Sequence, residues 1–474
     1  MHAENHSLYT ENGLTSNPLF DTDSYKLSHW LQYPPETQET FFYLESRGGL
    51  HNKTVFFGLQ AILKVLMATP ITHAMVDEVA EVAKWHGEPF NAEGFHKMVD
   101  RYHGKWPVRI RAVREGTVVP TSQVLMTMQS TDPEFYWIPS YLEPQIMRVW
   151  YTTTVASISW HIKQAIRAAL RETSDDPEAV LPFKLHDFGS RGVSSRESAA
   201  LGGVAHLVNF LGTDTVMALR AAKCFYHEDQ AGFSIPAAEH STITSWGRER
   251  EREAYRNMLR TFGKPGALLA VVSDSYDIYN AIDVEWAALK DEIIASGATV
   301  VIRPDSGDPV SVVTKCLEKL DAVFGSTLNK KGYKVLNHVR LIQGDGVNPD
   351  SINEIIASVI SKGFSIDNVA FGMGGALLQK CDRDTQKFAL KCSAARINGE
   401  WVDVFKDPVT DTGKRSKKGL LTLLRHYETG EYRSAHPDEA DTKWVDVLHT
   451  IFENGELVRE WTLKEVRSRA EAPV

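Results

Sequence analysis

The stretch TVVIRPDSGDPVSVVTKCLEKLDAVF, residues 299–324, joins a short apolar run to an amphipathic one through a polar turn. Residues 299–302 are mostly β-branched and apolar, which indicates a buried strand. From Pro309 the apolar residues recur at helical spacing, and Ser306 or Asp308 suits the N-cap of such a helix. A strand followed at once by a helix is the unit from which parallel β/α folds are built.

The same unit recurs through the middle of the chain. The turn residues Asp274, Asp305, Asp345 and Gly374 are 31, 40 and 29 residues apart, about the length of one strand and one helix. This repeat predicts a parallel β/α barrel, with a doubly wound sheet as the alternative; we favour the barrel because no strand precedes a dinucleotide-binding glycine fingerprint. Further strands are expected at 183–186, 267–272, 339–342 and 368–370, and further helices at 276–289 and 349–361.

The two ends of the chain lack this strand-and-helix repeat and show a different pattern. Asn398-Gly399 lies between two runs of period-two alternation, 388–396 and 401–406, which is a strong hairpin signal. We expect a loosely ordered extension over residues 1–20, with structure beginning near Asp21. Residues 21–150 and 385–474 are expected to form an α+β domain of N- and C-terminal antiparallel sheet. Residues 151–384 are expected to form a β/α barrel between its two parts. Within the second of these, strands are expected at 39–45, 108–113, 124–129, 420–427 and 432–435, and helices at 58–67 and 74–86.

Composition excludes several classes of protein. The 474 residues are 43% hydrophobic, but no apolar run approaches the roughly 20 residues that span a bilayer, and the N-terminus lacks a signal-peptide pattern. We therefore expect a cytoplasmic protein with no membrane partner. The net charge of −9 disfavours nucleic acid, so an anionic ligand needs a local cationic pocket. The cysteines are too sparse for a disulfide framework or a metal site and are expected to be reduced thiols, mostly in the core: Cys224, Cys316, Cys381 and Cys392.

Polar groups at the predicted strand ends are the candidate ligand contacts. Arg303 can bind phosphate with two hydrogen bonds, and Asp305 beside it can accept from ribose hydroxyls or hold Mg²⁺. The glycine turns at Gly344 and at Gly374-Gly375 can offer bare backbone amides to a phosphate. The alternative is structural, since the same residues would cap helices or shape ordinary turns.

Three other residues have equally serious structural alternatives. Phe188 follows a predicted strand but could be a core aromatic, Asp214 could be a helix N-cap, and His240 could be a histidine in a turn. Basic residues lie in or near the C-terminal sheet: Arg383, Lys391, Lys406 and the run 414–418. A solvated face is the default for the run, and the alternative is that these cations hold a polyanion.

Taken together, the motifs resemble those of the nicotinamide phosphoribosyltransferases. The resemblance runs in order from about residue 21 to residue 460. Its motifs are DSYK (23–26), HDFGSRGVSS (186–195), GTDT (212–215), PAAEHST (236–242), SDSYD (273–277), IRPDSG (302–307), QGDGV (343–347), FGMGGALLQK (371–380), FKDPV (405–409) and KRSKKG (414–419).

This resemblance implies a type II phosphoribosyltransferase with an atypical β/α barrel, acting as a homodimer with shared active sites. The implied reaction makes nicotinamide mononucleotide and pyrophosphate from nicotinamide and phosphoribosyl pyrophosphate, with Mg²⁺. ATP hydrolysis is implied as a coupled step through a phosphohistidine at His240.

The resemblance also implies roles for individual residues. Phe188 and Tyr25 of the other subunit would sandwich the pyridine ring, and Asp214, with Arg303 nearby, would select the carboxamide. His240, Asp274 and Asp305 would be catalytic, the two carboxylates also lying near Mg²⁺. The ribose-phosphate contacts would be Arg303, Asp305, Gly344, Asp345, Gly374, Gly375 and Arg383. The pyrophosphate contacts would be Arg191, His240, Arg303, Arg47, Lys391 and Lys406, of which Arg47, Lys391 and Lys406 would come from the partner subunit.

Three other interpretations remain open at this point. A nicotinate phosphoribosyltransferase would share the fold. A catalytically silent binding or signalling protein would share the resemblance without the chemistry. A metal-dependent aldolase-like barrel would explain the strand-end acids, but neither Phe188 and Tyr25 nor the C-terminal cations.

Overall fold

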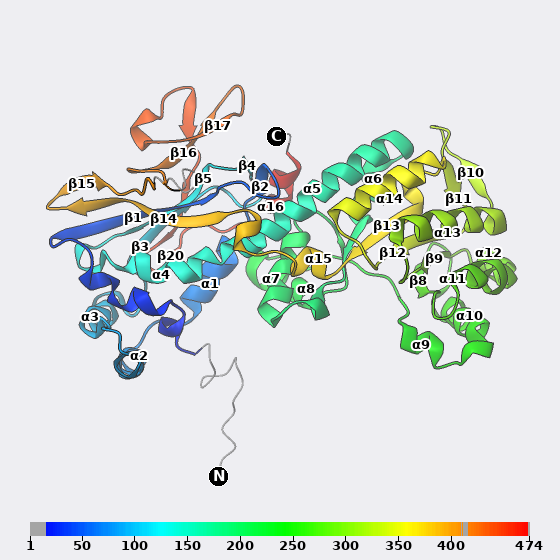
Figure 1. Cartoon of the computed structure of the whole chain (residues 1–474), viewed down its shortest axis with the longest axis horizontal. Helices are drawn as coiled ribbons and strands as arrows, with labels where there is room; N and C mark the ends of the chain where they lie inside the picture. Colours follow the sequence, from blue (N-terminus) through cyan, green and yellow to red (C-terminus); the bar gives the residue numbers. More distant parts are fainter. Residues whose placement is uncertain (1–15, 409, 411–415, 473–474) are drawn as a thin grey trace, which may run out of the picture. The chain divides into compact units, whose positions relative to one another are not determined.

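A computed structural model of the chain describes residues 16–408, 410 and 416–472 (Figure 1). The chain divides into two compact units. Unit 1 comprises the described residues within Met1–Ser157, Phe225–His227 and Asp382–Val474, and unit 2 comprises Ile158–Cys224 and Glu228–Cys381. The helices α5 (Val149–Thr173) and α8 (Val216–Tyr226) each contain a boundary between the two sets of residues.

Unit 2 is built on a parallel sheet of six short strands. Their order is β7-β6-β13-β12-β9-β8, and every pairing between neighbours is parallel. The carboxyl ends of all six strands therefore lie at one edge. The strands are β6 (Leu185–Asp187), β7 (Gly212–Thr213), β8 (Leu268–Val272), β9 (Thr299–Arg303), β12 (Val339–Gln343) and β13 (Val369–Met373).

The segment between Phe233 and Ala238 joins the two edges of this sheet. At one edge Phe233 bridges Gly212 of β7, and its N–H donates to the carbonyl of Leu211 at 2.7 Å. At the other edge Ala237 bridges Ala270 of β8, and the Ala238 N–H donates to the Ala270 carbonyl at 2.9 Å. Because one segment pairs with both edges, the sheet curls into a barrel. The barrel prediction is confirmed and the doubly wound alternative is wrong.

The helices of unit 2 mostly follow their sequence signals. In α13 (Pro309–Phe324), Asp308 is the N-cap and accepts from the Ser311 N–H at 2.9 Å, as the sequence allowed. The other helices are α6 (Pro177–Val180), α7 (Arg196–His206), α9 (His240–Thr244), α10 (Glu251–Phe262), α11 (Ile278–Asn280), α12 (Lys290–Ser296), α14 (Pro349–Ser361) and α15 (Gly375–Leu378).

Two predicted elements of unit 2 are wrong in detail. The helix expected over 276–289 is broken, because Ala281–Trp286 is a π-helix. The wider turn lets the Trp286 indole stack on Tyr255 at 4.4 Å and donate to the Ser273 hydroxyl at 3.0 Å. The strand expected from Phe183 begins at Leu185, because Leu181–Phe183 is a 3₁₀ turn containing Pro182, which has no N–H to give to a sheet.

Unit 1 is built on an antiparallel sheet of seven strands in the order β15-β14-β1-β5-β3-β19-β20. N- and C-terminal strands pair directly, since β1 lies between β14 and β5. The predicted hairpin joins β14 to β15, with positive φ angles of 51° at Asn398 and 83° at Gly399. The strands are β1 (Thr37–Ser46), β3 (Val108–Ala112), β5 (Val124–Ser130), β14 (Phe388–Ile397), β15 (Glu400–Asp403), β19 (His449–Glu453) and β20 (Glu456–Leu457).

Helices and two smaller sheets complete unit 1. The apolar faces of α1 and α2 contribute Leu59, Leu63, Val76 and Val79 to a core shared with the large sheet. The helices are α1 (Leu59–Ala68), α2 (His73–His86), α3 (Ala92–Tyr102), α4 (Ile138–Met147) and α16 (Leu463–Glu471). The small sheets contain β2 (Lys53–Val55) with β4 (Val118–Pro120), and β16 (Thr422–His426) between β17 (Tyr432–Ala435) and β18 (Trp444–Asp446).

Residues 1–15 of the expected N-terminal extension lie outside the described part of the chain. Residues 18–20 form a 3₁₀ turn with Leu19 fully buried, so ordered structure begins before Asp21. The cysteines are free thiols, but the expectation that most lie in the core is wrong, because only Cys316 is buried while Cys224 is exposed.

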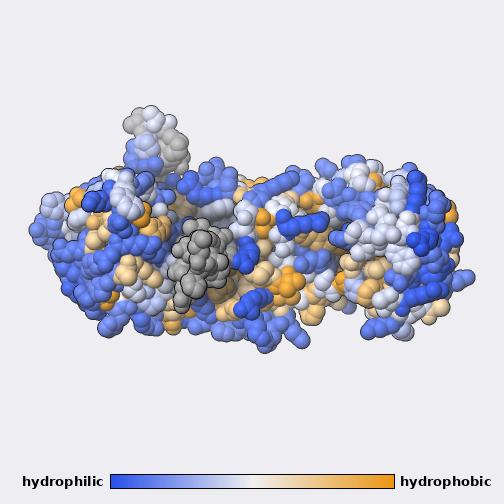
Figure 2. Space-filling view, turned by 90° about the horizontal axis from the view of Figure 1, so that it is seen from below, coloured by the Kyte–Doolittle hydropathy of each residue, from blue (hydrophilic) through white to orange (hydrophobic). Residues whose placement is uncertain are grey.

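Within the described ranges, no single helix has both the length and the hydropathy needed to cross a membrane. Only α1 and α2 taken together pass that test, and they are bent by 100° relative to each other. On the face seen in Figure 2, hydrophilic residues predominate and hydrophobic ones lie in small scattered groups.

Candidate active site

Most of the residues singled out from the sequence lie at one mouth of the barrel in unit 2. Because parallel strands end at the same edge, the residues that follow each strand meet there. Phe188 follows β6, Asp214 follows β7, Asp274 follows β8, Asp305 follows β9, Gly344 and Asp345 follow β12, and Gly374 follows β13. His240 begins α9, two residues after the segment that closes the barrel.

Phe188 lies over the inner surface of the barrel. Its half-buried ring packs against Ala270, Val301 and Ile342, which come from three neighbouring strands. A Cβ on Gly372 would lie 1.9 Å from Cε2 of this ring, so only glycine leaves room for it. Sequence reasoning took the glycines of this turn as a phosphate cradle and missed the role of Gly372.

Asp214 stands exposed at the end of β7. Its N–H donates to the Asp187 carbonyl at 2.9 Å, and one carboxylate oxygen accepts from the Ser234 hydroxyl at 2.5 Å. The next helix, α8, begins at Val216, two residues after Asp214. Ser234 is a neighbour that sequence reasoning missed.

Buried Asp187 lies directly beneath this strand end. Burial raises the pKa of its carboxyl group, although the Gly189 N–H donates to it at 2.7 Å. The nearby negative charge of Asp214 raises this pKa further. Asp214 therefore has a second carboxyl group beside it, one whose raised pKa disfavours its ionisation.

His240 and two carboxylates form a hydrogen-bonded group at the same mouth. The Nε2 atom of His240 lies 3.0 Å from Oδ1 of Asp274, and its Nδ1 lies 3.9 Å from Oδ2 of Asp305. The other oxygen of Asp274 accepts from the Asp305 N–H at 2.9 Å and from the Ser306 hydroxyl at 2.5 Å. The side chain of Asp274 is only 5% exposed, whereas His240 is 45% exposed.

These contacts keep Asp274 ionised. Burial on its own raises the pKa of the carboxyl group, but hydrogen bonds from Ser306, His240 and the Asp305 backbone outweigh burial and hold the pKa below its ordinary value. An ionised Asp274 accepts the proton on Nε2 of His240. The lone pair of the neutral imidazole is then on Nδ1, the nitrogen that faces Asp305.

The cationic and glycine candidates of unit 2 surround this group. Arg303, the last residue of β9, is largely buried, with one terminal nitrogen 3.9 Å from Asp305 and with its Nε buried and unpartnered. Arg191 is exposed in the turn after Phe188. Asp345 is exposed, and a Cβ on Gly375 would meet no atom within 4 Å, so the mouth is open there.

The remaining candidates lie in unit 1, where three cations gather near β1 and β14. Burial is the main cause that lowers the pKa of Lys391; the negative charge of Glu143 raises it, and the positive charges of Lys26, Arg47 and Lys406 lower it further. Arg47 donates to Glu45 at 2.9 Å. Carboxylates therefore already balance part of this positive charge, with Glu143 acting on Lys391 and Glu45 paired with Arg47.

Tyr25 and Arg383 are exposed on unit 1, and the Lys26 ammonium lies 5.2 Å from the centre of the Tyr25 ring. Of the basic run 414–418, residues Lys414 and Arg415 lie outside the described part. Lys417 and Lys418 pair with Glu45 and Asp403.

No three His, Cys, Asp or Glu side chains gather as a metal site anywhere in the described residues. Both oxygens of Asp274 are already engaged by His240, Ser306 and the Asp305 backbone, so Asp274 does not fit a metal ligand. Asp305 fits better, because its carboxylate makes only the two contacts at 3.9 Å.

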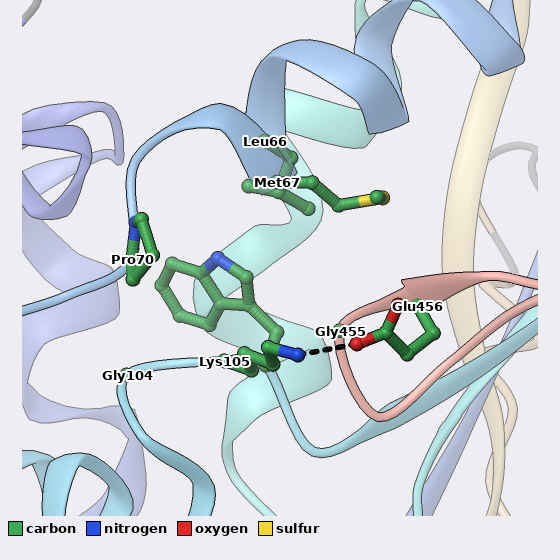
Figure 3. Close-up of a pocket in the computed structure, with 8 residues that line it drawn as sticks. Leu66, Met67, Pro70, Gly104, Lys105, Gly455 and Glu456 are labelled. Carbon is green, nitrogen blue, oxygen red and sulfur yellow. Dashed lines mark hydrogen bonds and ion pairs between the residues drawn. The ribbon is translucent and has the colours of Figure 1, made fainter.

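A separate cavity of about 180 Å³ lies in unit 1 (Figure 3). Lys105 and Glu456 form an ion pair at its edge. None of the predicted site residues lines this cavity. Its lining is Leu66, Met67, Pro70, Gly104, Lys105, Trp106, Gly455 and Glu456.

Comparison of the sequence with known proteins finds one enzyme family. The model described as "Nicotinate phosphoribosyltransferase (NAPRTase) family" matches residues 183–456, more than half of the chain. The chain belongs to the nicotinate phosphoribosyltransferase family. A second model, "Nicotinamide phosphoribosyltransferase, N-terminal domain", matches residues 17–110. The chain is therefore a phosphoribosyltransferase, and the aldolase-like alternative is wrong.

Individual members of this phosphoribosyltransferase family are similar over the whole chain. A nicotinamide phosphoribosyltransferase of Xanthomonas campestris pv. campestris is 64% identical over 460 residues, covering 96% of this chain and 98% of that protein. One from Acinetobacter baylyi is 32% identical, covering 96% and 97%. The crystal structure of a nicotinate-nucleotide pyrophosphorylase from Pyrococcus furiosus shares the fold, with a TM-score of 0.61, 17% identity, and coverage of 98% and 96%.

Proposed function

We propose that this phosphoribosyltransferase acts on nicotinamide, making nicotinamide mononucleotide and pyrophosphate from nicotinamide and phosphoribosyl pyrophosphate. The observation that carries the proposal is Asp214, an exposed carboxylate at the barrel mouth with one oxygen held by Ser234. Its second oxygen can accept from the NH₂ of a carboxamide. Nicotinate would instead bring a like charge to the same place, at a cost of about 1–4 kcal/mol at 4 Å, depending on local dielectric. The names of the two relatives agree with this choice.

Phe188 supplies one face of the pyridine site in this proposal. The ring occupies the space that the missing Cβ of Gly372 leaves, and it packs against three apolar strand residues. It therefore offers a rigid surface for stacking. The opposite face is assigned to Tyr25 of a second copy of the chain. The exposed ring of Tyr25, 55% accessible, is available for such a contact in a homodimer.

Arg303 and the glycine turns would hold the ribose 5-phosphate. The unpartnered Nε of Arg303 is a buried donor that an anion would satisfy. Asp305 and Asp345 can accept from ribose hydroxyls, and the turns at Gly344, Gly374 and Gly375 complete this part of the proposed site.

Arg191 and His240 face the pyrophosphate in this scheme, and Arg47, Lys391 and Lys406 of a partner subunit close on it. Negative charge grows on the pyrophosphate as its bond to the ribose breaks. Positioned cations stabilise that charge, so catalysis rests on positioning and electrostatics. The buried, unpartnered Nη2 atom of Arg47 supports the assignment, because an anion would satisfy that donor.

Mg²⁺ would be held chiefly by the phosphates of the substrate, with Asp305 as one protein ligand. Its contribution there would be to neutralise phosphate charge. Asp274 is withdrawn from the metal proposal because its oxygens are engaged elsewhere.

We also infer that ATP is coupled to the reaction through phosphorylation of His240. With Nε2–H donated to Asp274, Nδ1 carries the lone pair and is the nucleophile. Nδ1 attacks the γ-phosphorus of ATP, the bond to the β–γ bridging oxygen breaks, and ADP leaves. The proton stays on Nε2 of His240. The ionised Asp274, which accepts the hydrogen bond from Nε2, balances the positive charge that develops on the ring.

Product analysis tests the nicotinamide proposal. The chain is incubated with phosphoribosyl pyrophosphate and Mg²⁺, with either nicotinamide or nicotinate, and with or without ATP, and the mononucleotide formed is identified by mass. Nicotinamide mononucleotide is expected, in higher yield with ATP. Faster formation of nicotinate mononucleotide would make the chain a nicotinate enzyme. Absence of pyrophosphate release with both pyridines would point to a silent binding protein.

A further inference from the structure

Two histidines on neighbouring helices of unit 1 face each other through the same ring atom. His73 is the first residue of α2, and His96 lies in the middle of α3. Their Nδ1 atoms are 2.8 Å apart, and the rings lie 5.0 Å apart with an angle of 30° between their planes. This pair is separate from the candidate active site, and none of the proposed roles uses it.

The opposite nitrogen of each ring contacts a carboxylate. Nε2 of His73 lies 3.1 Å from Asp100, and Nε2 of His96 lies 3.3 Å from Asp77. The arrangement is reciprocal, because Asp77 is four residues after His73 on α2 and Asp100 is four residues after His96 on α3. Each carboxylate thus serves the histidine of the other helix.

These contacts determine where the ring protons are. A carboxylate accepts a hydrogen bond, so each Nε2 carries the proton of its neutral imidazole. Each Nδ1 then presents a lone pair, and two lone pairs at 2.8 Å repel each other. The pair requires an electrophile between the two nitrogens, either an extra proton or a metal ion.

We propose that His73 and His96 bind a divalent transition-metal ion, Zn²⁺ being the representative, through their two Nδ1 atoms. Imidazole nitrogen is a preferred ligand of Zn²⁺. Zn–N bonds of about 2.0–2.1 Å at a tetrahedral angle put the two nitrogens about 3.3 Å apart, so the rings need to separate by about 0.5 Å. They must also turn, because with ring centres 5.0 Å and nitrogens 2.8 Å apart the two lone pairs point mainly at each other. The exposed side chains, 52% accessible for His73 and 32% for His96, leave room for water as the remaining ligands.

Asp77 and Asp100 would act as outer partners of the metal. Histidines that bind a metal usually donate their other N–H to a carboxylate, which fixes the ring and makes it a better ligand. Both histidines have that partner here. The bound ion would join α2 to α3 at a place where each helix supplies one ligand and one orienting carboxylate.

The test is zinc titration of the untagged full-length chain after treatment with chelator. Calorimetry at pH 7.5 should show one site that is weakened at least about tenfold in His73→Gln and in His96→Gln. Asp100→Asn, which removes only an outer partner, should weaken it by about tenfold or more. The matched control is His86→Gln, on the same helix but hydrogen-bonded to Ser24 at 2.7 Å, which should leave the site unchanged.

X-ray absorption at the zinc edge provides a second readout that does not depend on affinity. The wild-type chain with less than one equivalent of Zn²⁺ should show two imidazole nitrogens and oxygen ligands. The proposal is overturned if His73→Gln and His96→Gln bind Zn²⁺ as the wild type does. In that case the two Nδ1 atoms share a proton and not a metal ion.

Discussion

Replacing Asp274 by asparagine tests how the imidazole of His240 is held. Asp274 uses one oxygen for His240 and the other for the Ser306 hydroxyl and the Asp305 N–H. Asparagine has only one oxygen, and the two donors of the 305–306 turn will take it. Its NH₂ group then faces Nε2 of His240 and donates to it, so the ring proton moves to Nδ1. The proposed nucleophile loses its lone pair.

The size of the effect follows from the lost contact. A hydrogen bond to a charged group contributes about 1.5–3 kcal/mol, and each 1.36 kcal/mol is a factor of ten. Phosphorylation of His240 in Asp274→Asn should therefore be slower by about 10- to 150-fold. Transfer without ATP should fall less, because it does not require Nδ1 as a nucleophile.

The assay is incorporation of acid-labile label from γ-labelled ATP, with His240→Ala as the blank. Asp308→Asn is the matched control: it makes the same chemical change three residues after Asp305, where asparagine can still cap α13. Labelling of Asp274→Asn at the wild-type rate would refute the reasoning. An equal loss in Asp308→Asn would show that the loop, not the tautomer, is responsible.

Three further predictions concern other parts of the account. Ser234→Ala frees the carboxylate of Asp214 and should raise the KM for nicotinamide about fivefold at nearly constant kcat; steady-state kinetics showing an unchanged KM would contradict this. Mixing inactive Tyr25→Ala and Asp214→Ala subunits should restore about a quarter of wild-type activity, because half of randomly formed dimers regain one intact site; no recovery after verified subunit exchange would exclude a shared site. Burial lowers the pKa of His206 to about 3, while its ring contacts Ser159 and the Gly212 carbonyl. The unfolded chain therefore binds more protons between pH 6.5 and 3, so this group should lower the free energy of unfolding by about 1.4 kcal/mol per pH unit as the pH falls through that range. His206→Gln should flatten the slope, as measured by urea unfolding at several pH values; an unchanged slope would assign it to other groups.

Local signals were sufficient for the elements that depend on adjacent residues. The helix α13 begins at Pro309 and ends at Phe324, as predicted, because its cap, its proline and the glycine after it all act within a few residues. The Asn398-Gly399 hairpin was equally predictable, since a two-residue turn fixes the pairing of its strands. The common mouth followed from the rule that parallel strands end at one edge.

Contacts between distant residues were not predictable from these patterns. The closure of the barrel depends on isolated bridges from a segment containing Pro236, which has no strand periodicity. The pairing of His240 with Asp274 spans 34 residues. The need for glycine at 372 appears only when the ring of Phe188 is placed beside it. Each of these depends on how strands stack around the barrel rather than on neighbouring residues.

The ratio of kcat/KM for nicotinamide to that for nicotinate, measured in the wild type and in Asp214→Asn, tests the central claim most directly. A repulsion of about 1–4 kcal/mol between Asp214 and nicotinate predicts a wild-type ratio of at least about fivefold in favour of nicotinamide. The asparagine variant, which lacks the charge, should lose most of that preference. A wild-type ratio near or below one, or a ratio that Asp214→Asn leaves unchanged, would contradict the account.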